Sequence, residues 1–142
     1  MATTSRKIFI DTSVLTAFVD RGNGRHLRAA KALEVTASIG YRIFTTPAII
    51  NESYEELRLQ VGTTVALEFL QIVLQSGIEV TFLQKTDLNS AYRVLKFNRT
   101  EQISFTEALT AALMQRKGIT QILTFRTWHN LFGTTASTLG VI

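Results

Sequence analysis

Short apolar runs, rich in β-branched and aromatic residues, alternate along this sequence with segments of helical periodicity. Four such runs predict buried strands, at residues 7–10, 41–45, 78–83 and 119–125. Strands that alternate with helices form βαβ units, in which the helices cover both faces of a parallel sheet. We therefore predict an α/β fold with a mostly parallel central sheet.

Two of the helical segments carry signals at their ends. Thr46 followed by Pro47 is typical of a helix cap and the first helical residue. The apolar residues that follow are expected to share one helical stripe: Ile50, Tyr54, Leu57 and Val61. Ser104 and Glu107 have the spacing of a capping box, which predicts a helix that ends near Gly118.

The size and composition of the chain favour one globular domain spanning residues 1–142. Its 142 residues match a typical domain, and no linker or internal repeat divides them. Hydrophobic residues make up 46% and charged residues 18%, which supplies a core and excludes a disordered chain. The chain has no cysteine, so disulfides, zinc-thiolate sites, iron-sulfur clusters and cysteine nucleophiles are excluded.

The charge balance and the hydropathy pattern bear on partners and location. The net charge of +4 permits an anionic partner without requiring one. No apolar stretch approaches the roughly 20 residues of a membrane span, and the first eleven residues do not resemble a signal peptide. We therefore expect a cytoplasmic protein without membrane segments.

Acidic residues fall near the ends of the predicted strands, where parallel sheets form their binding sites. Asp11 follows the first strand directly, and Glu52 lies near the start of the helix after the second strand. Glu107 lies in the first turn of the helix before the last strand. Carboxylates gathered at one sheet edge repel one another unless they share a cation, and Mg²⁺ or Mn²⁺ prefers oxygen ligands. Such a site suits phosphodiester hydrolysis.

Each of these carboxylates also has a purely structural interpretation. Asp11 is a suitable N-cap for a helix that begins at the next residue. Glu107 completes the capping box with Ser104. Glu52 is about 200° around an ideal helix from Ile50, away from the apolar stripe and on the face expected to be solvated. The sequence alone leaves these alternatives open.

Basic residues gather in one segment that contains no acid: Arg21, Arg25, Arg28 and Lys31. This segment could bind RNA phosphates, and an ordinary solvated helix face explains it equally well. His26 and His129 belong to no zinc motif, and the absence of a G-x-S-x-G motif argues against a serine hydrolase. We expect Trp128 and the phenylalanines in the core rather than as platforms for base stacking.

Four segments resemble, in order, the successive motifs of the PIN domain family: KIFIDTSVL at residues 7–15, TPAIINE at 46–52, SFTEAL at 104–109 and ILTF at 122–125. The resemblance implies a three-layer α/β fold, with a parallel sheet of four to five strands flanked by helices. It also implies a Mg²⁺- or Mn²⁺-dependent ribonuclease in which Asp11, Glu52 and Glu107 are the catalytic and metal-binding carboxylates. Because the family includes the toxins of VapBC pairs, it further implies a homodimer held by a small antitoxin.

Two positions depart from the usual pattern of the family. Glu107 stands where the family usually has Asp, and Arg126 stands where it usually has an Asp near the end. Opposite a cluster of carboxylates, the Arg126 guanidinium would pair with Asp11 or Glu107, lower their pKa values and compete with a metal cation. Glu101 is a candidate substitute ligand, and Ser13 and Thr124 are candidate auxiliary residues of the site.

The sequence therefore supports two principal hypotheses. In the first, the protein is a metal-dependent endoribonuclease in which a bound water attacks the phosphorus and the basic segment orients the RNA. In the second, it is a PIN-fold module that has lost catalysis and binds RNA or a protein, with Arg126 in place of the metal. A third possibility, an α/β domain of unrelated function, requires the four-motif order to be a coincidence.

Overall fold

The computed structural model describes residues 6–133 and 137–138. Five strands form one sheet in the order β3-β2-β1-β4-β5, and every neighbouring pair is parallel. The strands are β1 (Lys7–Ile10), β2 (Arg42–Thr45), β3 (Glu79–Val80), β4 (Gln121–Leu123) and β5 (Ser137–Thr138). The predicted α/β fold with a parallel sheet is confirmed.

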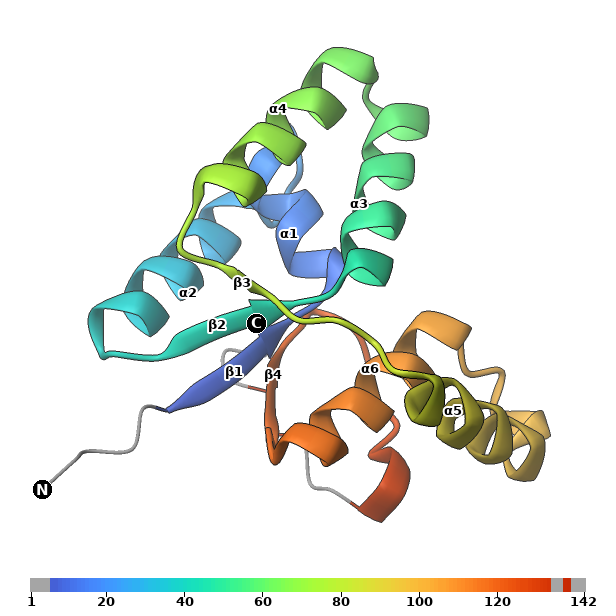
Figure 1. Cartoon of the computed structure of the whole chain (residues 1–142). Helices are drawn as coiled ribbons and strands as arrows, with labels where there is room; N and C mark the ends of the chain where they lie inside the picture. Colours follow the sequence, from blue (N-terminus) through green and yellow to red (C-terminus); the bar gives the residue numbers. More distant parts are fainter. Residues whose placement is uncertain (1–5, 134–136, 139–142) are drawn as a thin grey trace, which may run out of the picture.

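Helices cover both faces of the sheet, as Figure 1 shows. On one side lie α1 (Thr12–Val19), α2 (His26–Ser38), α3 (Pro47–Gln60) and α4 (Thr63–Gln75), and on the other lie α5 (Lys85–Phe97) and α6 (Phe105–Lys117). Two short 3₁₀ turns follow in the chain, η1 (Arg99–Glu101) before α6 and η2 (Leu131–Gly133) after β4. Within the described ranges, no helix is long and apolar enough to cross a membrane.

Local signals place the ends of α3 and α6 where the sequence predicts them. The Thr46 hydroxyl accepts the N–H of Ile49 at 3.2 Å, and Pro47 is the first residue of α3. At the other helix, Gly118 has φ +68°, the left-handed conformation that ends α6.

The predicted apolar stripe of α3 is correct for Leu57, which is buried, and for Ile50 and Tyr54, which are partly buried against the core, but it is wrong for Val61. The buried residues of α3 are Ile49, Ser53 and Leu57, whereas Val61 is 44% exposed. Ser53 tolerates burial because its hydroxyl donates to the Ile49 carbonyl at 2.7 Å. The buried face of α3 also includes Ile49 and Ser53, so the neighbouring Glu52 lies at the edge of this face and not on the far side of the helix.

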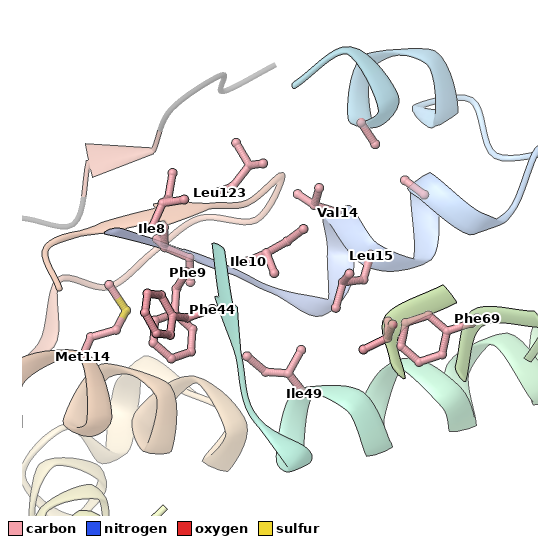
Figure 2. Packing of buried hydrophobic residues seen from close by; sticks show 14 of the residues in the cluster. Ile8, Phe9, Ile10, Val14, Leu15, Phe44, Ile49, Phe69, Met114 and Leu123 are labelled. Atoms are coloured by element: carbon pink, nitrogen blue, oxygen red, sulfur yellow. The ribbon is translucent and has the colours of Figure 1, made fainter. Parts of the chain in front are cut away.

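The core forms on the central strand. Ile8, Phe9 and Ile10 of β1 are all fully buried, and the Phe9 ring stacks on Phe44 of β2 with the ring centroids 6.3 Å apart (Figure 2). The expectation that the aromatic residues lie in the core holds for Trp128 and Phe132, which are partly buried against the clusters. It is wrong for three side chains that are at least half exposed: Phe82, Phe97 and Phe105.

A nearly buried ion pair joins α5 to α6. Both carboxylate oxygens of Asp87 accept hydrogen bonds from Arg116, each at 2.9 Å. Asp87 also accepts the N–H of Gln84 at 2.8 Å, and its side chain is only 2% exposed. The pair therefore fixes the start of α5 against the last turn of α6.

Candidate active site

A pocket of about 190 Å³ opens where β1 ends, between the first turns of α3 and α6. The carboxylates of Asp11, Glu52 and Glu107 come to it from three different elements. The other residues that line the pocket are Thr12, Ile49, Gln102, Ser104, Thr106, Thr110, Arg126, Thr127 and Trp128. The predicted edge of the sheet thus brings together three acids that lie far apart in the sequence.

Asp11 is held by neutral hydroxyl groups. Ser13 donates to Oδ1 at 2.6 Å, and Thr124, which follows β4, donates to Oδ2. Asp11 is also the N-cap of α1, since it accepts the N–H of Val14 at 3.3 Å. The capping interpretation is correct, and it coexists with a place in the pocket. Ser13 and Thr124 contact Asp11 through these hydrogen bonds but do not line the pocket.

Burial raises the pKa of Asp11 above its usual value. The hydrogen bonds from Ser13, Thr124 and Val14 and the positive charge of Arg126 lower it, but they do not compensate for the desolvation. No cationic side chain within the described ranges forms an ion pair with Asp11. Burial therefore disfavours the ionised form of Asp11, and a cation close to this carboxylate would favour that form.

Replacing Asp11 with asparagine is therefore expected to stabilise the fold at neutral pH. Since the folded-state pKa is raised, the wild-type protein loses stability as the pH rises through the unfolded pKa of about 3.9 and on to the folded value. The melting temperature of Asp11→Asn should match that of the wild type near pH 3 and exceed it at pH 7. Thermal unfolding of both proteins between about pH 3 and about pH 7 measures the difference in melting temperature. An Asp11→Asn protein that is more stable than the wild type only at low pH would contradict the expectation.

Glu52 is paired with Arg126. The Arg126 guanidinium lies 3.3 Å from Glu52 Oε1 and 3.6 Å from Glu56 Oε2. The interpretation of Glu52 as a solvated residue on the far side of the helix is wrong, because α3 turns this position toward the pocket. The prediction that Arg126 pairs with Asp11 or Glu107 is wrong, because its ion pairs in the described ranges are with two carboxylates of α3. Arg126 therefore occupies the place of a cation next to one of the three carboxylates of the pocket.

Glu107 is paired with His129. Glu107 Oε2 accepts the backbone N–H of His129 at 3.0 Å and lies 2.7 Å from its Nδ1. The capping box is only half formed, since Ser104 accepts the N–H of Glu107 at 3.0 Å while the Glu107 carboxylate turns to His129. Nothing in the sequence indicates this pair, because 22 residues separate its members.

The remaining candidates lie outside the pocket. Glu101 is exposed on η1, and its neighbour Gln102, with φ +51°, lines the pocket instead. The four basic residues are all exposed, around the start of α2. Arg25 and Arg28 approach the Phe125 ring, whereas Arg21 and Lys31 do not.

By donor type, the pocket fits a hard divalent cation. Three carboxylates line it, and the Thr12 hydroxyl is buried there without a hydrogen-bond partner. As these side chains lie, however, no three Asp, Glu or His residues in the described part of the chain are close enough to bind one ion together. A metal bound by these carboxylates would compete with Arg126 for Glu52 and with His129 for Glu107.

Comparison with known families shows the family of this chain. The PIN domain model matches residues 8–126, which include all three carboxylates. The chain belongs to the PIN domain family. No curated protein matches this PIN domain significantly.

Solved structures share the fold of this PIN domain. VapC20 of Mycobacterium tuberculosis, described as a sarcin-ricin loop cleaving toxin, is 26% identical over 84% of this chain and 89% of its own, with a TM-score of 0.76. VapBC2 from Rickettsia felis, bound to a DNA fragment from its promoter, is 12% identical over 84% and 88%, with a TM-score of 0.66. FitAcB from Neisseria gonorrhoeae is 12% identical over 92% and 95%, with a TM-score of 0.65.

Proposed function

We propose that this protein is a metal-dependent endoribonuclease of the toxin type, with Asp11, Glu52 and Glu107 as its catalytic and metal-binding residues. The observation that carries the proposal is the convergence of these three carboxylates, from three elements of a PIN fold, on one pocket. The likeness to VapC20, a toxin that cleaves RNA, supports the substrate class. Bound Mg²⁺ or Mn²⁺ would activate water and neutralise the charge that develops on the phosphate.

Several side chains hold the carboxylates and the wall of the pocket in position for this chemistry. Ser13 and Thr124 orient the Asp11 carboxylate through hydrogen bonds, so that it faces the substrate without having to reorganise. Trp128, partly buried against both core clusters, forms an apolar part of the wall and limits the access of water. His129 holds Glu107 until a cation competes for that carboxylate.

The family resemblance supports the partners, and the composition and hydropathy pattern of the sequence support one domain and a cytoplasmic location. We propose a cytoplasmic single-domain protein, spanning residues 1–142, that forms a homodimer and is inhibited by a small antitoxin. A second candidate, a PIN module that binds RNA or a protein without catalysis, is favoured by one observation. Arg126 already neutralises Glu52 and Glu56 and thereby replaces part of the charge that a metal would supply.

RNA cleavage by the purified protein tests the proposed function. We expect wild-type protein to cleave single-stranded RNA with Mn²⁺ or Mg²⁺ and not with EDTA. Glu52→Gln and Asp11→Asn should each reduce the rate on the order of 100-fold or more. Glu55→Gln is the matched control, because Glu55 lies on the same helix and pairs with Arg58 instead. Cleavage that persists in EDTA or in Asp11→Asn would contradict the proposal, and no cleavage by any variant would favour the binding module.

A further inference from the structure

Two arginines approach one aromatic ring beside the pocket. The guanidinium carbon of Arg25 lies 5.0 Å from the centroid of the Phe125 ring, and that of Arg28 lies 5.9 Å from it. The N–H of Phe125 donates to Ser13 Oγ at 3.0 Å, and Ser13 donates to Asp11. Two successive hydrogen bonds therefore connect the backbone of Phe125, which carries this ring, to the pocket carboxylate of Asp11.

Within residues 6–133 and 137–138, no ion pair compensates the charges of these two arginines. Arg25 is the N-cap residue of α2, and Arg28 lies in the first turn. Cations are unfavourable there because the N-terminus is the positive end of the helix dipole. The first turn of α2 contains no acidic residue, and Arg25 makes no side-chain capping bond. No acidic side chain in the described ranges pairs with either arginine.

Two positive side chains at the positive end of a helix favour the binding of an anion. Phosphate groups bind both to guanidinium pairs and to the free N–H groups of helix N-termini. The contact with an aromatic face restricts each arginine, which lowers the entropy lost when a ligand binds. Arg21 and Lys31 have no such contact and are not restrained in this way.

We propose that Phe125 positions Arg25 and Arg28 as a clamp for the phosphate backbone of single-stranded RNA next to the carboxylate pocket. The clamp rests on the proposed function, since it binds the substrate of that same site. Of the four basic residues in the segment, Arg25 and Arg28 bind the RNA phosphates in this clamp, and Phe125 positions them. Arg126, the next residue, lies in the pocket itself, so an RNA strand held by the clamp would continue toward Asp11.

Salt-dependent binding of a labelled oligouridine, measured in EDTA so that metal-dependent cleavage is prevented, tests the clamp. We expect the double variant Arg25→Gln, Arg28→Gln to bind roughly tenfold more weakly or worse. Its plot of log affinity against log salt should be shallower by about 1.4, or about 0.7 for each lost phosphate contact on a single strand. The double variant Arg93→Gln, Arg99→Gln removes the same charge from exposed residues elsewhere and should change the slope by less than half as much.

Phe125→Leu separates positioning from charge. It keeps an apolar side chain and both arginines, so we expect weaker binding with a nearly unchanged salt slope. Equal losses in the two double variants, or wild-type protein that does not bind the oligouridine, would overturn the clamp. Cleavage of RNA by the wild type in Mn²⁺ decides the proposed function separately. If the wild type cleaves RNA and the double variant Arg25→Gln, Arg28→Gln binds RNA as well as the wild type, the clamp alone is refuted. If the double variant binds RNA more weakly, with a shallower salt dependence, but the wild type does not cleave RNA, the nuclease function alone is refuted.

Discussion

Asp87→Ala is expected to lower the free energy of unfolding by about 2 to 3 kcal/mol. The substitution leaves Arg116 without its carboxylate and removes the acceptor of the Gln84 N–H at the start of α5. Because Asp87 is only 2% exposed, water cannot fully replace these bonds. Chemical denaturation measures the loss.

An exposed ion pair provides the control for this substitution. Arg42 and Glu79 also form a bidentate pair, but their side chains are 44% and 40% exposed. Exposed pairs contribute about 0 to 1 kcal/mol, so Glu79→Ala should have a small effect. Equal losses from Asp87→Ala and Glu79→Ala would contradict a structural role for the pair between α5 and α6.

The contribution of Asp87 also depends on pH. Burial raises the pKa of Asp87, but the hydrogen bonds from Arg116 and Gln84, together with the positive charges of Arg116 and Lys117, outweigh it, and the pKa is lowered overall. The stability from this ionised group is therefore present above the unfolded pKa of about 3.9 and is lost as the pH falls below it. The stability difference between wild type and Asp87→Asn should shrink as the solution is acidified.

Arg126→Gln is expected to tighten Mn²⁺ binding about tenfold, because it removes a positive charge next to a site for a divalent cation. It also frees Glu52, which Arg126 holds at 3.3 Å. Arg126→Asp should tighten binding further, since it adds a carboxylate oxygen at the pocket. Isothermal titration calorimetry with Mn²⁺ gives the affinities.

Arg58→Gln is the matched control for Arg126, because Arg58 lies on α3 and pairs with Glu55 away from the pocket. It should leave the Mn²⁺ affinity unchanged. An Arg126→Gln protein with the affinity of the wild type would show that Arg126 does not compete with the cation. Loss of RNA binding in Arg126→Asp without any gain in Mn²⁺ affinity would support the binding module instead.

The sequence predicts those parts of the fold that depend on local chemistry. Apolar runs locate the central strands, Thr46 and Pro47 locate the start of α3, and Gly118 locates the end of α6. The carboxyl-edge rule brings Asp11 and Glu52 to one pocket, because both follow neighbouring parallel strands.

Contacts between distant segments are not predictable in this way. The buried face of α3 includes Ser53, whose hydroxyl is satisfied within the helix, and a count of apolar residues misses this residue. The pairing of Glu107 with His129 and of Arg126 with Glu56 depends on how the segment after β4 folds back over α3 and α6. The same folding brings Phe125 to Arg25 and Arg28, which lie about 100 residues earlier in the chain.

The most direct test of the central claim, that Asp11, Glu52 and Glu107 form one cation site, is a Mn²⁺ titration followed by electron paramagnetic resonance. We predict one bound Mn²⁺ per wild-type chain. Asp11→Asn, Glu52→Gln and Glu107→Gln should each weaken binding on the order of tenfold or more, while Glu101→Gln should leave it unchanged. Wild-type protein that binds no Mn²⁺, or equal affinities across all these variants, would contradict the account.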